Sequence, residues 1–438
     1  MSSTSTPNAP VPWGDDSIAA KTLENALVSD IMPADTITHN AVILDGDPTE
    51  PASDGSTPDG FTPGGSATAT GDDWIASAGG TVIARGRGMG WKDLNTSATV
   101  QIIDAEGAYL APAYVDMHCH GAGGSSAEDG EPGLAEVLAV HRRHGTRALA
   151  LSYVSDTVPG LCRSLAAGAR LCRDNPAVLG LHTEGPFLSP DFKGAHAPEV
   201  LTAPTPEAVE SILAAADGRL AQITIAPELP GAIDAISRFA SAGVSVAIGH
   251  TAAGYEEAAR AFEAGARILT HTFNAMPGIH HRAPGPILAA IDAGHVSLEL
   301  INDGVHVAGP PARMLAKLVP GRIALITDAM AATGMADGRY MLGSLPVQVD
   351  DSVARLLGED GSTASIAGST LTMDDAVMRA VAEVGMSPLA AVQAASLVPL
   401  RALGLIAEDE HCLLRAGMPA DYLLLNADMS IQAQNMAR

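Results

Sequence analysis

Between about residues 112 and 330, short apolar runs alternate with Ala-rich stretches of helical spacing. Runs that are apolar on both faces are typical of buried parallel strands. Eight strand–helix units suit a closed (β/α)8 TIM-like barrel better than an open doubly wound sheet. The expected strands are 113–118, 147–154, 177–183, 221–226, 244–249, 267–271, 296–301 and 322–327. The expected helices include Leu134–His144, Leu161–Cys172, Pro206–Ala216, Ala232–Ala242 and Tyr255–Ala264.

Local signals refine the limits of this α/β barrel, which we expect to span residues 111–404. Three glycines stand where a helix end favours a left-handed residue, namely Gly145, Gly243 and Gly265. The eighth helix is delayed until Met373–Val384. It follows an insertion, about 338–369, whose alternation predicts a β-hairpin.

The two ends of the chain predict a second, smaller unit. Residues 1–16 are rich in Ser, Thr and Pro and are expected to form a disordered tail. Strand-like segments in 17–110 and 405–438 predict a small β-sandwich domain built from both termini. Within it, the Pro-, Gly-, Ser- and Asp-rich tract at about 45–73 predicts a flexible loop.

Charge and cysteine usage restrict the classes of partner and location. The 438 residues carry 25 Lys and Arg against 50 Asp and Glu, a net charge of −25. Such a surface repels nucleic acid and anionic membranes, so we expect neither as a partner. The N-terminal segment MSSTSTPNAP lacks the features of a signal peptide, and no apolar run reaches the length of a membrane span. The four cysteines form no CxxC pair, which favours reduced thiols in the cytoplasm.

Side chains of the types that bind divalent metals stand at the ends of the expected strands. His118 and His120 are two apart on the first strand, so both imidazoles can reach one ion. Glu184 ends an apolar run, where a buried carboxylate is costly unless it is paired or metal-bound. His250 and His271 close two consecutive strands. Because a barrel brings its strand ends to one face, these five residues predict a site for one or two divalent ions. Zn, Fe, Mn and Co all suit such ligands.

Further residues predict chemistry around this metal. Asp328 ends the eighth strand, beside the first, and could ligate the ion, shuttle a proton, or merely cap the following turn. His196 could polarise a substrate carbonyl, and Arg282 and His306 could bind a phosphate, although each could also be an ordinary surface residue. We read His182 as a packing or supporting residue. His141 and His144 fall in a helix and look solvated.

Seven segments, taken as a set, resemble the amidohydrolase superfamily and, within it, the N-acetylglucosamine-6-phosphate deacetylases. The similarity spans about residues 105–425. The segments are VDMHCHGAGG, HTEGPFLSPDFKGAHAPE, TIAPEL, AIGHTAAGYEEAARAFEAGA, THTFNAMPGIHHRAPGP, DGVHV and TDAMAATG.

This resemblance implies an activity, the hydrolysis of N-acetyl-D-glucosamine 6-phosphate to D-glucosamine 6-phosphate and acetate in amino-sugar catabolism. It implies core metal ligands at Glu184, His250 and His271, with His118 and His120 added where a second ion binds. It further implies a catalytic acid and base at Asp328, a hydrogen bond to the scissile acetamide from His196, substrate contacts at Asn274 and Ala275, and phosphate contacts from Arg282 and His306. In such enzymes the phosphate contacts come from the neighbouring subunit of a homodimer.

Two other functions remain open at this point. The same metal chemistry would serve a cyclic-amide or N-acyl-amino-acid hydrolase, and Arg282 is the residue that separates these from a sugar-phosphate enzyme. A non-catalytic sugar-phosphate sensor on a barrel scaffold is the third possibility. An intact Asp328 argues against the sensor, because a binding module needs no proton shuttle.

Overall fold

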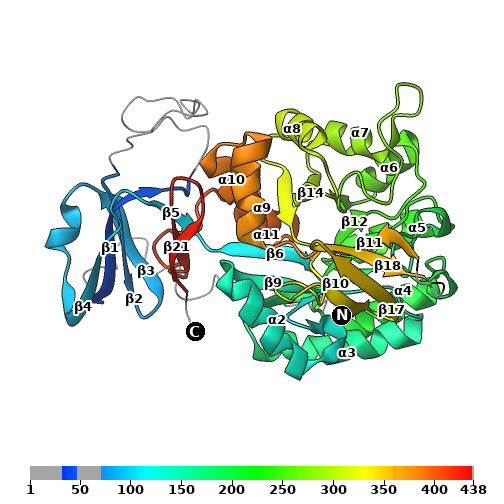
Figure 1. Cartoon of the computed structure of the whole chain (residues 1–438), viewed down its shortest axis with the longest axis horizontal. Helices are drawn as coiled ribbons and strands as arrows, with labels where there is room; N and C mark the ends of the chain where they lie inside the picture. Colours follow the sequence, from blue (N-terminus) through cyan, green and yellow to red (C-terminus); the bar gives the residue numbers. More distant parts are fainter. Residues whose placement is uncertain (1–31, 47–70, 359, 361, 437–438) are drawn as a thin grey trace, which may run out of the picture.

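The computed structural model describes residues 32–46, 71–358, 360 and 362–436. The expected tail, 1–16, and most of the expected loop, 45–73, lie outside these residues. At the centre, eight parallel strands follow one another in chain order around a barrel (Figure 1). They are β6 (Tyr114–Cys119), β9 (Thr146–Tyr153), β10 (Val178–Glu184), β11 (Leu220–Ile225), β12 (Ser245–Ile248), β13 (Ala266–Leu269), β14 (Ser297–Ile301) and β15 (Ile323–Ile326).

The last strand returns to the first and closes the barrel. A parallel bridge joins Cys119 to Ala329, and the backbone N of Asp328 donates to the carbonyl O of His118 at 2.9 Å. Every residue of β6 and of β10 is buried, as expected for strands covered on both faces. The predicted barrel is therefore confirmed, and its strand limits lie within two residues of those expected from the sequence.

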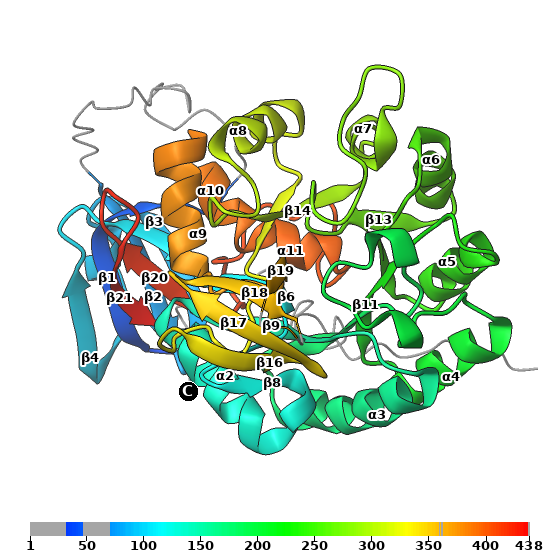
Figure 2. The ribbon, with the colours of Figure 1, turned by 45° about the vertical axis from the view of Figure 1, so that its right-hand side comes forward.

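Helices cover the outside of the barrel, each burying an apolar stripe against the strands (Figure 2). A fully buried side chain such as Ile236 or Phe239 contributes roughly 1.5–3 kcal/mol of folding free energy. The three glycines predicted to follow helices have positive φ angles of 82°, 82° and 114°. The helices are α2 (Glu131–Arg143), α3 (Val158–Asp174), α4 (Pro206–Ala216), α5 (Ala232–Ser241), α6 (Tyr255–Glu263), α7 (Gly285–Asp292), α8 (Gly309–Leu318), α9 (Met373–Arg379), the π-helical η6 (Ala380–Val384), α10 (Pro388–Ala394) and α11 (Leu397–Ala402).

Short elements lie in the connections. A two-stranded hairpin, β7 (Gly121–Ala122) with β8 (Ser125–Ser126), follows the first barrel strand. The 3-10 turns are η2 (Gly90–Asp93), η3 (Ala127–Asp129), η4 (Pro190–Phe192) and η5 (Pro198–Val200). Within the described ranges, every helix is too short or too polar to cross a bilayer.

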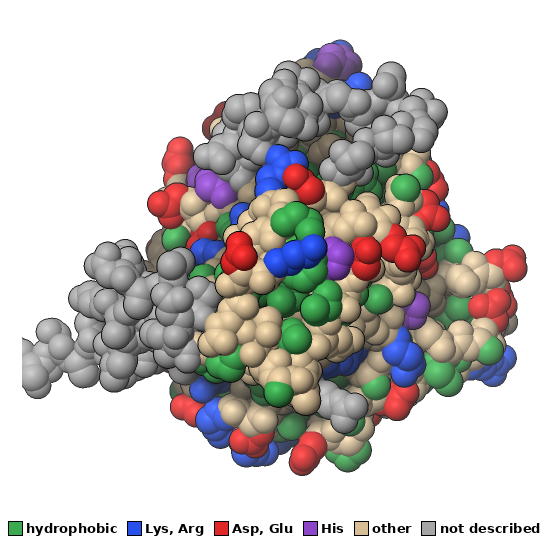
Figure 3. Space-filling view, turned by 90° about the vertical axis from the view of Figure 1, so that its left-hand side faces the viewer, with side chains coloured by type: hydrophobic (Ala, Val, Ile, Leu, Met, Phe, Trp, Pro, Cys, Tyr) green, Lys and Arg blue, Asp and Glu red, His purple; other side chains and the backbone are tan. Residues whose placement is uncertain are grey.

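Strands from both ends of the chain form the small β domain. The first half of β1 (Ala34–Ile43) pairs with β2 and β4, whereas its last two residues pair with β5. β5 pairs with β20 near the C-terminus, so the chain ends meet as predicted. Its strands after β1 are β2 (Asp73–Ala78), β3 (Thr81–Arg87), β4 (Thr96–Asp104), β5 (Tyr109–Pro112), β20 (Tyr422–Leu425) and β21 (Ile431–Asn435). On the face in Figure 3, the coloured Lys and Arg side chains are interspersed with acidic ones.

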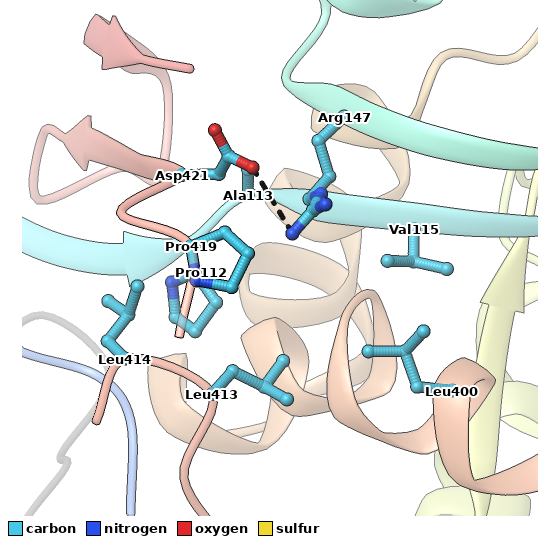
Figure 4. A pocket seen from close by; sticks show the side chains of 9 residues that line it. All are labelled: Pro112, Ala113, Val115, Arg147, Leu400, Leu413, Leu414, Pro419 and Asp421. Atoms are coloured by element: carbon cyan, nitrogen blue, oxygen red, sulfur yellow. Dashed lines mark ion pairs between the residues drawn. The ribbon is translucent and has the colours of Figure 1, made fainter. Parts of the chain in front are cut away.

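Paired polar groups connect the small domain to the barrel and to the C-terminal segment. The Asp45 carboxylate accepts hydrogen bonds from the backbone N of Leu413 at 2.9 Å and of Leu414 at 2.7 Å. Arg85 lies 3.1 Å from the same carboxylate. An ion pair of 3.2 Å joins Arg147 of β9 to Asp421, beside a cavity of about 10 Å³ (Figure 4). Such a volume holds about one water molecule, so this junction is closely packed.

The insertion after β15 is larger than the predicted hairpin. It forms a four-stranded antiparallel sheet of β16 (Gly338–Leu342), β17 (Leu345–Asp350), β18 (Val353–Leu357) and β19 (Thr363–Ile366). Apolar side chains of both hairpins, including Val347 and Ala354, bury one shared face against Met330. The sheet ends at Ile366, and three residues later the backbone N of Ser369 donates to the Asp328 carbonyl O at 2.7 Å.

Candidate active site at the barrel mouth

The six residues predicted from strand ends converge at one end of the barrel. His118 and His120 come from β6, and Glu184 ends β10. The other three stand two residues after the ends of their strands and are His250, His271 and Asp328. All six are buried. The spatial prediction that joins these distant positions is therefore correct.

Glu184, His250 and His271 form the first group of donor atoms. Glu184 Oε1 lies 3.0 Å from Nε2 of both histidines, and these two nitrogens are 3.0 Å apart. His250 Nδ1 is 2.9 Å from the Phe192 carbonyl O, which can only accept a hydrogen bond. The Nδ1 atom therefore donates, and the Nε2 lone pair of His250 faces Glu184. A lone pair and a carboxylate at this separation fit a divalent cation.

His118, His120 and Asp328 form the second group. The two Nε2 atoms are 3.2 Å apart, and they lie 3.6 Å and 3.4 Å from Asp328 Oδ1. His120 Nδ1 donates to the Ser152 carbonyl O at 3.0 Å. His118 Nδ1 lies 3.1 Å from Glu299 Oε2. Both rings thus direct Nε2 inward. Glu184 Oε2, 3.4 Å from His120 Nε2, bridges the two groups.

The electrostatics of the site favour positive charge. Burial by itself lowers the pKa of His118, but the carboxylates of Glu299, Asp328 and Glu184 outweigh it and raise that pKa to about 9. Asp328 and Glu184 likewise overcome burial and raise the pKa of His120 to about 10. Burial raises the pKa of Asp328, yet the two histidines lower it to about 2. A bound cation would take the place of these protons. Imidazole and carboxylate donors suit Zn, Fe, Mn or Co.

The backbone at the site is strained. His250, His271 and Asp328 have φ angles of 46°, 23° and 50°, in a region that residues other than glycine rarely adopt. Hydrogen bonds hold Asp328 there on both sides, from its N to the His118 O and to its O from the Ser369 N. Strain of this kind persists where the surrounding structure over-determines a functional conformation.

Two further histidines support the metal groups. His196 Nδ1 accepts from the Ser155 N at 3.3 Å, so its Nε2–H donates to Glu184 Oε2 at 3.2 Å. Burial lowers the pKa of His196 to about 4, which keeps the ring neutral. His182 lies 2.9 Å from Ser152 Oγ, and its ring packs 4.5 Å from that of His118. It is therefore a supporting residue, as the sequence suggested.

A pocket of about 360 Å³ opens above these groups, a size typical of small-molecule sites. The insertion sheet forms part of its wall, which the sequence did not predict. The residues lining the pocket are His120, Glu184, Asp191, Phe192, Gly194, Ala195, His250, His271, Asn274, Ala275, Ile301, His306, Asp328, Leu342, Ser365, Ile366 and Gly368. His118 and His196 lie behind this wall, buried against the ligands.

The two predicted phosphate-binding residues lie in different places. His306, expected to reach the phosphate from the neighbouring subunit, instead lines the pocket of its own subunit, and its Nδ1 is 2.6 Å from Asp303 Oδ2. Burial raises the pKa of Asp303, but the hydrogen bonds of His306 lower it below its ordinary value. Arg282 does not line the pocket. It is exposed on the loop before α7, which projects beyond the helical layer (Figures 1 and 2).

Two residues differ from what the sequence suggested. Glu299, which the strand-end pattern missed, is fully buried on β14 and lies against His118. A carboxylate inside the apolar run SLELI was the available signal. His141, expected to be solvated, is fully buried, with Nε2 3.1 Å from Cys119 Sγ, and burial lowers its pKa to about 4. It lies on the face of α2 that packs against the barrel.

A model of the amidohydrolase family matches residues 109–437. The chain belongs to this family. It is 35% identical over 337 residues to an N-acetylgalactosamine-6-phosphate deacetylase of Escherichia coli O157:H7, covering 76% of this chain and 88% of that protein. It is 32% identical over 329 residues to an N-acetylglucosamine-6-phosphate deacetylase of Vibrio furnissii, covering 74% and 80%.

A solved structure supports the same relationship. It is a mutant N-acetyl-D-glucosamine-6-phosphate deacetylase of Mycobacterium smegmatis in complex with N-acetyl-D-glucosamine 6-phosphate. The identity is 38% and the TM-score 0.76, with 83% of this chain and 93% of that chain covered. The resemblance read from the sequence motifs is thus confirmed.

Proposed function

We propose that this protein hydrolyses the acetamide of N-acetyl-D-glucosamine 6-phosphate to D-glucosamine 6-phosphate and acetate, in amino-sugar catabolism. The observation that carries the proposal is the convergence of two groups of metal-type donor atoms, one of which includes Asp328, at the floor of a pocket. Relatives that are named for this activity, 32% and 38% identical, support the choice of substrate.

The donor groups define where one or two divalent ions would bind. Glu184, His250 and His271 would hold the first ion, and His118 and His120 would hold a second. A divalent ion there supplies Lewis acidity that makes water a nucleophile at neutral pH. Zn, Fe, Mn and Co are the candidate ions.

The residues of the chain would move the protons. In the metal-free protein His118 and His120 lower the pKa of Asp328 to about 2, and a bound cation would favour its ionised form in the same way, so a carboxylate oxygen is free of a proton. We assign it the proton lost by water during attack on the acetamide carbon. It then returns that proton to the departing nitrogen, since an amide nitrogen leaves poorly unless protonated. His196, whose Nε2–H donates to Glu184 Oε2 in this structure, would have to turn that N–H to the acetamide oxygen, where negative charge develops.

The substrate would be held by residues above the metal groups. Asn274 and Ala275 line the pocket, and the Asn274 side chain donates to the His271 carbonyl O at 3.1 Å. We assign them contacts with the sugar through amide or backbone groups. His306, whose Nδ1 is held by Asp303, would direct its other ring nitrogen to the 6-phosphate.

The phosphate site would be completed in a homodimer. Arg282 lies outside the pocket of its own subunit, on a projecting loop that also exposes Ile279. We propose that Arg282 of the partner subunit reaches the phosphate. We also propose a cytoplasmic location, supported by the four cysteines, all of which are free thiols.

The test of this function is acetate release by the full-length, metal-loaded protein. We expect Arg282→Ala to raise KM sharply for N-acetylglucosamine 6-phosphate and hardly at all for unphosphorylated N-acetylglucosamine, since only the former offers a bidentate anion. Arg260→Ala, at an exposed position of α6, is the matched control and should change neither KM. Equal effects of Arg282→Ala on both sugars would favour a cyclic-amide or N-acyl-amino-acid hydrolase.

A second candidate substrate is N-acetyl-D-galactosamine 6-phosphate. The observation that favours it is the 35% identical relative from Escherichia coli O157:H7, an N-acetylgalactosamine-6-phosphate deacetylase. Comparing kcat/KM for the two phosphorylated sugars on one preparation distinguishes them. The absence of acetate release from either sugar would instead favour the non-catalytic sensor.

A further inference from the structure

Glu299 is a buried carboxylate that the proposed reaction does not use. It lies on β14 inside the barrel with 0% of its surface exposed. Its Oε1 accepts from Gln222 Nε2 at 2.8 Å. Its Oε2 accepts from the His271 backbone N and from His118 Nδ1, each at 3.1 Å. Within the described part of the chain, the only ion pair recorded for Glu299 is with His118.

A buried carboxylate is unfavourable for folding unless a positive charge offsets it. Packing alone would be served better by the apolar side chains found around it, such as Leu298 and Leu300. With Glu184 and Asp328, Glu299 makes three buried carboxylates that lie within 3.8 Å of the ring nitrogens of His118. Their summed charge exceeds that of a single divalent ion. The excess favours a second cation at the same site.

Glu299 also joins the two donor groups. His118 belongs to the group with His120 and Asp328, whereas His271 belongs to the group with Glu184 and His250. By accepting from His118 Nδ1, Glu299 fixes the tautomer in which Nε2 has its lone pair toward His120. A carboxylate in this position also makes a metal-binding imidazole more basic. By accepting from the His271 N, it helps hold the strained backbone of that residue.

We propose that Glu299 is a positioning residue that orients His118 and so determines whether a second divalent cation occupies the group of His118, His120 and Asp328. This inference rests on the proposed function only in requiring a metal-dependent site. It concerns cation binding, which can be measured without sugar.

The test is Glu299→Gln in the full-length protein, titrated with Zn²⁺ against a chelator and analysed for bound metal. The substitution keeps the shape of the side chain and removes its charge. We expect the wild type to bind two ions, and the variant to bind one of them about 10–100-fold more weakly. Asp116→Asn is the matched control, because Asp116 is a buried carboxylate on β6 that contacts the His118 backbone N and not its ring. It should leave both affinities unchanged.

A measurement on the wild type keeps the proposal testable if the variant fails to fold. Nitrogen NMR of the Zn²⁺-loaded protein should show the His118 ring protonated at Nδ1 and unprotonated at Nε2. Protonation at Nε2, a wild type that binds one ion, or unchanged Zn²⁺ affinity in Glu299→Gln would each overturn the proposal. If Glu299→Gln binds metal more weakly but the wild type releases no acetate, the proposed role of Glu299 stands and the proposed function is rejected.

Discussion

Buried polar groups are arranged differently at the barrel mouth and at the junction with the small β domain. At the junction polar groups pair with complementary partners, as between Asp45 and the backbone N of Leu413, or between Arg147 and Asp421. At the mouth, atoms that can each bind a cation face one another. Nε2 of His250 and Nε2 of His271, for example, are 3.0 Å apart. The mouth also has the strained backbone of Asp328. The junction is therefore built for stability, whereas the mouth is built to bind a cation.

The largest expected effect is at the mouth, for Asp328→Asn. The amide keeps the shape of the side chain but cannot take up the proton that the reaction releases. We expect kcat for acetate release to fall by about 10²–10⁴-fold, while the first metal ion stays bound and the unfolding temperature changes little. Metal analysis and calorimetry of the same samples check the last two points. A near-normal kcat would show that the role of Asp328 is wrong.

The next effect is at the junction, for Asp45→Ala. This change leaves the backbone N–H groups of Leu413 and Leu414 without their acceptor, and Arg85 without its partner. We expect the free energy of unfolding to fall by about 2–4 kcal/mol, with kcat per folded molecule unchanged. Denaturant unfolding and acetate release measure the two.

The matched control for the junction is Asp72→Ala. Asp72 pairs with Arg87 at the surface, where both side chains are about half exposed. Such a pair contributes about 0–1 kcal/mol. A loss as large for Asp72→Ala as for Asp45→Ala, or a large loss of kcat in Asp45→Ala, would remove the distinction between the two regions.

The smallest effect is a pH dependence that only the mouth should show. In the metal-free protein the pKa values of His118 and His120 are raised to about 9 and 10, from about 6.5 when unfolded. Their protonation stabilises the fold fully below about pH 6.5, and this stabilisation is lost as the pH rises through 9 and 10. Bound metal displaces these protons. The difference in Tm between metal-loaded and metal-free protein should therefore widen between pH 6.5 and 9. A constant difference would contradict the electrostatics described for the mouth.

The sequence predicted the mouth better than its surroundings. Eight apolar runs located the barrel strands because buried parallel strands leave little room for polar residues. Candidate ligands such as Glu184 and His250 stood out because they end those runs. Glu299 lies inside a run, and its partner His118 is 181 positions away, so only the closed barrel reveals the contact.

Other features depended on tertiary contacts that local patterns do not contain. The insertion alternates like a hairpin, but it forms four strands, and side chains of β16, β17 and β18 share a core with Met330. His141 looked solvated in its helix until the packing of α2 placed it against Cys119. The placement of Arg282 outside its own pocket likewise follows from the loop before α7, whose path the motif HHRAPGP does not specify.

The most direct test of the central claim is an anomalous difference map from crystals of the metal-loaded protein, recorded at the absorption edge of the bound metal. The account predicts a peak at about 2.0–2.2 Å from His250 Nε2, His271 Nε2 and a Glu184 oxygen. Metal bound elsewhere in the molecule, with these three side chains making no bond to it, would contradict the account.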